Sequence, residues 1–431
     1  MNMKDTSTPV VVLKTEHYGG LGIMRSLGRL GISVYGVDRA RHFPAMQSRF
    51  CRKSFRWDID DAPFEDSAEF LLSLSKRFKK RAILIPTSDE TTMLVAQCAD
   101  VLKEGFMFPY QPAGLIRSLC HKKEMYFLAR RHGIPIPDSY FPASRNEALQ
   151  LSETLSYPLL LKRIDRRKLH LAGKAVLVHN AEQLMEKYDG MEDDGNPNIM
   201  IQKYIPGRDD CAWTFNGFFD KNSDCLVAFT GKKIRQYPIY AGMMSLGISR
   251  WNEMVASSAQ EFMKAIGYHG IVDIDFRFDA QDERFKVLAV NPRIGATFRL
   301  FVGRNGMDVV RALYLALTDQ QVSPTVPWEN RKWIVEDNDL LSSYRYVRDR
   351  KLSFSGWIHS FRGINEAGYF AFDDPVPFFS MWGNHMRRLL ARIVRRRRVH
   401  SQRKNIRSAS DRKRKITIEI EQHVEQERVQ V

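Results

Sequence analysis

Two features of membrane and secreted proteins are missing from this 431-residue sequence. No run reaches the roughly 18 apolar residues of a membrane span, and residues 1–8 are polar, without the apolar stretch of a signal peptide. Cysteine is scarce: its five residues are odd in number and form no C-x-x-C pair. We therefore expect a cytoplasmic protein with reduced thiols at Cys51, Cys98, Cys120, Cys211 and Cys225.

Acidic residues are outnumbered, because 66 Lys and Arg stand against 50 Asp and Glu and give a formal net charge of +16. Residues 387–415 hold fourteen Lys or Arg and one acid, so this segment carries +13 and the rest of the chain only +3. A terminal basic arm without interleaved aromatic side chains is unlike a single-strand binding groove. Nucleic acid is therefore not expected as the main partner.

Two interpretations of this basic end stay open. Blocks of like charge are usually solvated extensions. Alternatively, residues 378–415 form an interfacial helix whose apolar face enters a bilayer while its arginines meet anionic lipid head groups. The second interpretation would place a cytoplasmic protein at the inner face of the membrane.

The rest of the chain is globular in composition, with 44% hydrophobic residues, and is long enough for two or three domains. A strand at residues 9–13, a glycine-containing turn at 18–22, a helix to about residue 30 and a strand at 33–37 form a βαβ unit. A further strand at 82–85 ends in polar residues. These elements predict a parallel α/β domain.

A helix expected at residues 118–132 opens a second region, in which the pattern is mixed and largely antiparallel α+β. Strands are expected at residues 159–162, 175–178, 199–204, 211–218, 225–230, 270–278 and 285–291. We divide the chain into an α/β domain at 1–115, an α+β domain at 116–320, a small unit of unassigned role at 321–380 and a basic tail at 381–431 that is either amphipathic or disordered.

A predicted hairpin carries the first chemical signal. Asp273 and Asp275 lie two apart in an apolar strand and so share a face, and Asn291 closes the next strand and can lie across from them. The acids could also be chance residues of a solvated hairpin, but acids inside an apolar strand are costly to bury without a partner. Hard oxygen ligands that converge in this way predict a magnesium site, with Arg293 beside it.

A second signal is Lys162, at the end of the apolar strand 157–162, where an ammonium group could meet a phosphate. Such a lysine can equally be a surface residue whose stem packs on apolar neighbours. Lys122 lies before it, and residues 201–207 look like a strand that runs into a hinge whose backbone could bind adenine. The loop at 163–168 is charged, so side chains more than backbone amides would cover the phosphates.

These segments, taken with the hairpin, occur in the order and spacing of the ATP-grasp superfamily. The sequence resembles most the branch of predicted carboxylate-amine ligases, which is related to D-aspartate ligases and more distantly to biotin carboxylase and carbamoyl-phosphate synthase. The resemblance implies an N-terminal α/β domain followed by a two-subdomain ATP-grasp fold with antiparallel sheets. It also implies ATP as substrate, with magnesium or manganese as the metal.

The resemblance carries roles to individual residues. It implies that the nucleotide is bound by Lys122, Lys162, Gln202, Lys203, Ile205 and Asp210. It implies that the metal is held by Asp275 and Asn291, with Asp273 as a further ligand. Arg293 would stabilise the transferring phosphoryl group or the carbonyl of the acyl phosphate. The basic residues that would face the γ-phosphate are Lys233 and Arg235, which could equally be exposed surface cations. In the first domain the acceptor wall would include Glu16, His17, Asp38 and residues 88–90, which could equally be turn and cap residues.

The chain departs from the family at Ala289, where relatives usually have an acid that bridges two metal ions. Asp273 could compensate, one magnesium could suffice, or the protein could bind nucleotide with little ligase turnover. The implied reaction converts a small-molecule carboxylate into an acyl phosphate, which an amine then attacks. This chemistry needs no side-chain nucleophile, and the sequence contains no triad-like arrangement. A homodimer is left open.

Overall fold

The computed structural model describes residues 3–164, 175–192, 197–239 and 242–391. The chain divides into two compact units, residues 1–378 and 379–431. In the second unit residues 379–391 are helical, and the part of the expected lipid-facing segment from 392 to 415 lies outside the described residues. No helix among the described residues combines the length and the apolarity that a bilayer span needs.

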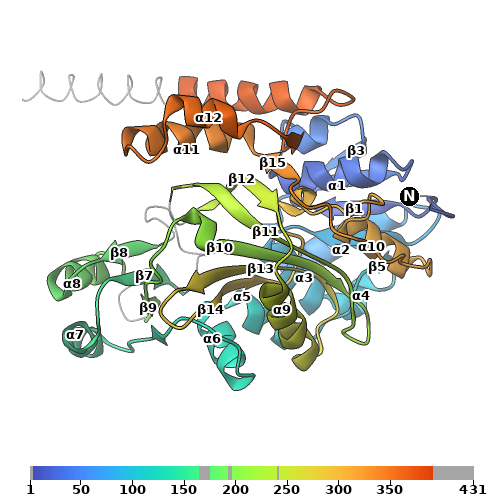
Figure 1. Cartoon of the computed structure of the whole chain (residues 1–431). Helices are drawn as coiled ribbons and strands as arrows, with labels where there is room; N and C mark the ends of the chain where they lie inside the picture. The colour runs from blue at the N-terminus through green and yellow to red at the C-terminus, as the bar shows by residue number, and fades with distance from the viewer. Residues whose placement is uncertain (1–2, 165–174, 193–196, 240–241, 392–431) are drawn as a thin grey trace, which may run out of the picture. The chain divides into compact units, whose positions relative to one another are not determined.

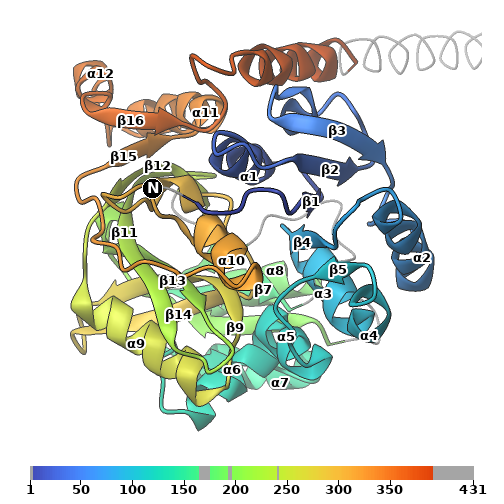
Figure 2. The same ribbon diagram turned by 90° about the vertical axis from the view of Figure 1, so that its right-hand side faces the viewer.

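The chain begins with a five-stranded parallel sheet, of which Figure 1 labels β1, β3 and β5. The strand order is β3-β2-β1-β4-β5 (Figure 2). Its central strands β1 and β4 are short apolar runs, as is typical of parallel sheets with both faces covered. The expected parallel α/β fold is therefore confirmed. Its strands are β1 (Val10–Leu13), β2 (Val34–Asp38), β3 (Cys51–Arg56), β4 (Ala82–Pro86) and β5 (Phe106–Met107). Its helices are α1 (Tyr18–Gly28), α2 (Phe64–Ser75), α3 (Asp89–Gln97) and α4 (Ala99–Leu102), with a 3-10 turn at Pro44–Gln47.

The turn expected at residues 18–22 is wrong, because helix α1 starts at Tyr18. Its glycines serve close packing instead. A β carbon on Gly19 would lie 2.9 Å from the Cα of Ala296, and one on Gly22 would lie 2.9 Å from the ring of Phe298. The start of α1 therefore packs directly on the loop that follows β14, and α1 also contacts α10 (Figure 2).

The single helix expected at residues 118–132 is two helices, α5 (Ala113–Cys120) and α6 (Lys122–Arg131). His121 between them has extended backbone angles, φ −94° and ψ 115°, and its ring accepts a hydrogen bond from the N–H of Glu124. A cap of this kind satisfies one of the N–H groups that a helix start leaves unpaired. Lys122 is therefore fixed as the first residue of α6.

A four-stranded antiparallel sheet follows, in the order β6-β9-β7-β8. Helices α7 and α8 contact each other, and apolar side chains such as Leu161, Leu184 and Tyr188 form the core beneath them. Its elements are β6 (Ser139–Tyr140), α7 (Arg145–Thr154), β7 (Leu159–Arg163), β8 (Val176–Val178), α8 (Ala181–Asp189) and β9 (Ile199–Lys203).

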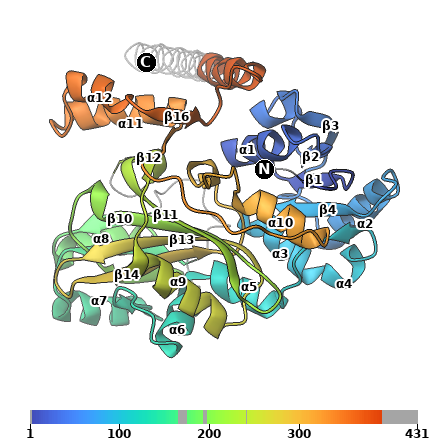
Figure 3. The same cartoon turned by 45° about the vertical axis from the view of Figure 1, so that its right-hand side comes forward.

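A seven-stranded sheet is the largest of the three, in the order β14-β13-β10-β11-β12-β15-β16. Helices α9 and α10 both pack on β10 (Figure 3), and α11 packs on β11 and β12. All neighbours are antiparallel except β15 and β16. Residues beyond 320 therefore extend this sheet. Its elements are β10 (Ala212–Phe219), β11 (Cys225–Tyr237), β12 (Met243–Ser249), α9 (Glu253–Ala265), β13 (Gly270–Asp279), β14 (Arg284–Asn291), α10 (Val309–Leu317), β15 (Lys332–Ile334), α11 (Glu336–Arg348), α12 (Phe354–Ser360) and β16 (Ile364–Ala367), with 3-10 turns at Asp209–Cys211 and Phe298–Leu300.

Candidate active site

Two acids of β13 and one amide of β14 form the acidic part of the site. The antiparallel register sets Asp273 opposite Asn291, and Asp275 opposite Ala289. Paired residues project to one face, as do residues two apart on a strand, so both carboxylates and the amide lie on the same face of the hairpin. The Nδ2 of Asn291 lies 3.4 Å from Oδ2 of Asp273.

Asp273 is enclosed by the chain around it. A β carbon on Gly295 would lie 2.5 Å from the carboxyl carbon of Asp273, so a larger residue there would displace this carboxyl group. The Nδ2 of Asn216 lies 3.5 Å from Oδ1 of Asp273. Burial and the negative charge of Asp275 raise the pKa of Asp273 above its ordinary value. The carboxylate form is therefore costly unless a cation is close.

Lys233 supplies one such cation, because its Nζ lies 3.0 Å from Oδ1 of Asp275. The Oδ1 of Asn216, beside Asp273, is buried and has no hydrogen-bond partner. No group of three His, Cys, Asp or Glu side chains suited to a metal occurs among the described residues. Two carboxylates and the amide of Asn291 nevertheless fit magnesium, which takes hard oxygen ligands and usually keeps several waters.

Arg293 connects the hairpin with the parallel sheet. Its Nε donates to Oδ1 of Asp89 at 2.7 Å, and its Nη2 donates to Oδ1 of Asn291 at 3.3 Å. Asp89 is the first residue of α3, directly after β4. The carboxyl edge of the parallel sheet therefore reaches the hairpin. Polar residues at 88–90 indicated this edge, but no local pattern links Asp89 with a partner 204 positions away.

Lys122, Lys162 and Gln202 lie together at the four-stranded sheet. Lys162 Nζ donates to Oε1 of Gln202 at 2.6 Å. Lys122 Nζ donates to the carbonyl oxygens of Arg163 and Ile164 at 2.6 and 2.9 Å. Two ammonium groups at the end of β7 form a basic site of the kind that phosphate oxygens occupy. Of the charged loop expected to cover it, residues 165–168 lie outside the described residues.

The hinge after β9 is held by backbone contacts. The N–H of Lys203 donates to the carbonyl of Asp138 at 2.9 Å, and the carbonyl of Ile205 accepts from Nε of Arg277 at 2.8 Å. Asp210 is exposed at the start of the following segment. The hinge backbone is therefore fixed, while the Asp210 carboxylate faces solvent.

Arg235 lies apart from the acidic hairpin. The register of β11 with β12 shifts between Lys233 and Arg235, which breaks the alternation that would put both side chains on one face. Arg235 instead donates from Nε and Nη2 to the buried carboxylate of Asp339 at 2.8 and 2.9 Å. Lys233 therefore pairs with Asp275, whereas Arg235 links α11 to the sheet through Asp339.

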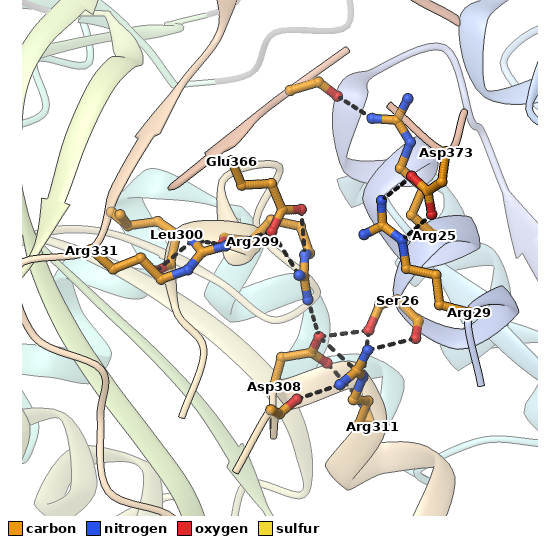
Figure 4. Close-up of polar contacts among 12 residues, drawn as sticks. Arg25, Ser26, Arg29, Arg299, Leu300, Asp308, Arg311, Arg331, Glu366 and Asp373 are labelled. Atoms are coloured by element: carbon orange, nitrogen blue, oxygen red, sulfur yellow. Dashed lines mark hydrogen bonds and ion pairs between the residues drawn. The ribbon is translucent and has the colours of Figure 1, made fainter. Parts of the chain in front are cut away.

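Arg299 is likewise engaged in a buried network (Figure 4). It donates to Glu366 at 2.8 and 2.7 Å and to Asp308 at 2.6 Å, and Arg331 donates to Glu366 at 2.5 Å. Ser26 of α1 donates to Asp308 at 2.6 Å. Burial alone would raise the pKa of Glu366, but Arg299 and Arg331 lower it to about 2. The network ties α1, the start of α10 and β16 together, and sequence reasoning missed Glu366 and Asp308.

The other candidates at the edge of the parallel sheet have local partners. Arg39 Nη2 donates to Glu16 at 2.7 Å, His17 Nε2 lies 3.6 Å from the Glu16 carboxylate, and the hydroxyl of Thr15 donates to Asp38 at 3.2 Å. Burial raises the pKa of Asp38 to about 6. These side chains therefore form a polar rim rather than a second cluster at the hairpin.

Comparison with known proteins finds similar sequences. Residues 122–316 match the family described as carbamoyl-phosphate synthase L chain, ATP binding domain. D-aspartate ligase from Enterococcus faecium (strain Aus0004) is 24% identical over 243 residues, which are 54% of this chain and 58% of the ligase. The chain thus spans less than two thirds of that relative's length. The resemblance noted from the sequence is confirmed.

Two solved structures are similar in fold. L-amino acid ligase from Bacillus licheniformis aligns with a TM-score of 0.56 at 15% identity, over 74% of this chain and 78% of that one. The biotin carboxylase domain dimer of Hydrogenobacter thermophilus 2-oxoglutarate carboxylase, solved with MgADP, ADP and bicarbonate, gives 0.56 at 16% identity over 74% and 72%. The chain shares the fold of these two enzymes, so the expected fold class is confirmed.

Proposed function

We propose that this ATP-grasp chain is a ligase that uses ATP and magnesium to activate a carboxylate as an acyl phosphate, which an amine attacks to form a C–N bond. The observation that carries the proposal is the acidic hairpin, where Asp273, Asp275 and Asn291 share one face beside Lys233 and Arg293. The family match over residues 122–316 and the two ligases among the similar proteins support it.

In this proposal the nucleotide binds at the four-stranded sheet. Lys122 and Lys162 contact phosphate oxygens as point charges. Gln202 orients Lys162 through their 2.6 Å hydrogen bond. The backbone of the hinge receives adenine, and the exposed carboxylate that follows meets the ribose; the residues are Lys203, Ile205 and Asp210.

Asp273, Asp275 and Asn291 would hold magnesium, which neutralises phosphate oxygens when bound; manganese is the alternative ion for this oxygen donor set. A carboxylate oxygen of the substrate attacks the γ-phosphorus in line, and ADP leaves with the electron pair of the broken P–O bond. Arg293 and Lys233 offset the charge at the reacting groups. Arg235, bound to Asp339, acts only by supporting the strand that carries Lys233.

In the second step the amine nitrogen attacks the acyl carbon of the mixed anhydride. Inorganic phosphate leaves with the electron pair of the C–O bond, and the amine gives up one proton. The chain's own contribution is to position both substrates and to exclude water, because water would hydrolyse the acyl phosphate.

A second candidate function is nucleotide binding with little ligase turnover. It is favoured by Ala289, which lies opposite Asp275 where the resemblance leads one to expect a metal-bridging acid. The variant Ala289→Glu distinguishes this function from an active ligase. If the missing acid limits turnover, the variant should have a higher kcat than wild type. If the site is active with Asp273 as the further ligand, the added carboxylate should crowd the metal site and lower the activity.

The proposal is tested by incubating the protein with MgATP, a panel of carboxylic and amino acids and hydroxylamine, which converts acyl phosphates into hydroxamates. We expect ADP and hydroxamate in equal amounts with at least one acid. Asp275→Asn should abolish both, whereas Asp282→Asn, an exposed acid in the turn of the same hairpin, should leave them unchanged. ATP binding without ADP release from any acid would favour the second candidate.

Two partners are also part of the proposal. A homodimer is suggested by the dimeric biotin carboxylase domain and is tested by the mass in light scattering. A peripheral contact of residues 378–415 with anionic lipid is suggested by their charge. Flotation with phosphatidylserine vesicles at low salt, lost at high salt, would support it, and full recovery in the aqueous fraction would exclude it.

A further inference from the structure

An apolar cavity of about 60 Å³ lies between the parallel sheet and the start of β13. Its walls come from segments far apart in the sequence: Leu84 of β4, Val95 and Ala96 of α3, Phe108 after β5, Ile271 of β13 and Ile294 after β14. One water needs about 10–15 Å³ of such space, so the cavity admits a chain of about four to six small heavy atoms. Such walls suit an aliphatic group.

Arg293 gives this cavity a single permanent charge. Among the residues that line the cavity, only Arg293 is charged, and only His269 titrates near neutral pH. Burial lowers the pKa of His269 and so favours its neutral form. The side-chain amide of Gln111 is already bound to the carbonyl oxygen of His269. The cavity therefore offers one cationic group, whose Nε is paired with Asp89, and otherwise mostly apolar contact.

The same arginine borders the acidic hairpin. Its Nη2 donates to Asn291 at 3.3 Å, and its Nε is fixed by Asp89 at 2.7 Å. A molecule with an aliphatic chain in the cavity can therefore place a carboxylate at Arg293, next to the proposed metal site. The aliphatic chain would then contact apolar walls, and the carboxylate would contact a guanidinium group.

We propose that this cavity binds the aliphatic part of the carboxylate substrate, so that the activated acid is a monocarboxylic acid or amino acid with an apolar chain of about four to six atoms. The inference rests on the proposed ligase function and specifies its substrate class. A second carboxylate, as in aspartate, would be buried against apolar walls with no cation of its own, which is costly. The similarity to D-aspartate ligase therefore does not extend to the acid used.

The first test measures hydroxamate formation with MgATP and hydroxylamine for straight-chain acids from acetate to octanoate, and for leucine against aspartate. Each methylene buried contributes about a fourfold increase in kcat/KM, so we expect a steep rise that ends near hexanoate. Leucine should exceed aspartate by at least about tenfold. Equal rates along the series, or a preference for dicarboxylates, would overturn the inference.

The second test fills the cavity. Ala96→Leu should lower kcat/KM for hexanoate by about tenfold or more and leave acetate unchanged, whereas Gln97→Leu, the exposed neighbour on α3, should change neither. Phe108→Leu enlarges the same space and should shift the optimum to a longer acid, so the inference stays testable if Ala96→Leu is unstable. An equal loss for all acids in both cavity variants would contradict it.

Failure of the proposed function is distinguishable from failure of this inference. If MgATP binds but no acid is turned over, the ligase proposal fails, and the cavity is then tested by calorimetry with hexanoate alone. Binding to the wild type that is lost in Ala96→Leu and kept in Gln97→Leu would support the cavity as a site. Absence of binding to the wild type would overturn it.

Discussion

Neutralising Glu366 should destabilise the protein strongly and in a pH-dependent way. Its carboxylate holds Arg299 and Arg331 at 2.7 and 2.5 Å inside the molecule. Arg299 and Arg331 lower its pKa from the ordinary 4.5 to about 2 against the opposing effect of burial. At about 1.4 kcal/mol for each pKa unit, the ionised carboxylate contributes roughly 3 kcal/mol at neutral pH. Glu366→Gln should cost about this much at pH 7, since it leaves the buried Arg331 without its carboxylate and Arg299 with Asp308 as its remaining anion.

The pH dependence follows from the direction of the shift. Because the folded pKa lies below the unfolded one, this contribution is complete above about pH 4.5 and is lost as the pH falls toward 2. Urea unfolding of wild type and Glu366→Gln between pH 7 and 3.5 should therefore give free energies that differ by a constant above pH 5 and converge below it. Glu104→Gln, an exposed control, should show no such difference. A difference under 1 kcal/mol at pH 7, or one that does not shrink in acid, would refute the reasoning.

Two further predictions concern the edge of the parallel sheet. Asp89→Asn removes the charge that fixes Nε of Arg293, so kcat/KM for the carboxylate should fall about tenfold while ATP affinity stays unchanged. The control is Asp100→Asn, at an exposed residue of α4. An equal fall in ATP affinity would argue against this role of Asp89. Asp38 has a folded pKa of about 6, above its ordinary 3.8, so wild-type stability is lost as the pH rises through this window. Asp38→Asn should therefore gain up to about 3 kcal/mol relative to wild type between pH 4 and 7 in urea unfolding, and a difference independent of pH would contradict the assignment.

Local patterns predicted the elements that lie closest to the site. The alternation of acids and apolar residues around Asp273 and Asp275 indicated their shared face, and the register with Asn291 agrees with it. The expected helix at residues 118–132 missed the break at His121, because a histidine cap has no strong sequence signal. The glycines of α1 favour a turn by local pattern, and their close contact with Ala296 has no local signal because it depends on a loop far along the chain.

Long-range features could not be predicted in the same way. Strand β15 has three residues and forms by pairing with β12 on one side and β16 on the other. The side chains of Lys233 and Arg235 have different partners because of a register shift between them, and the sequence there does not predict this shift. Glu366, Asp308 and Asp89 acquire partners only when the sheets assemble, so their roles follow from the three-dimensional structure alone.

We propose that the basic site at the four-stranded sheet binds MgATP, and calorimetric titration tests this binding most directly. Wild type and Lys264→Ala, which removes an exposed lysine of α9, should bind with the same Kd. Lys162→Ala should bind at least about tenfold more weakly, because a hydrogen bond to a charged group contributes roughly 1.5–3 kcal/mol. A wild-type protein that binds no MgATP, or a Lys162→Ala variant that binds as tightly as wild type, would contradict the account.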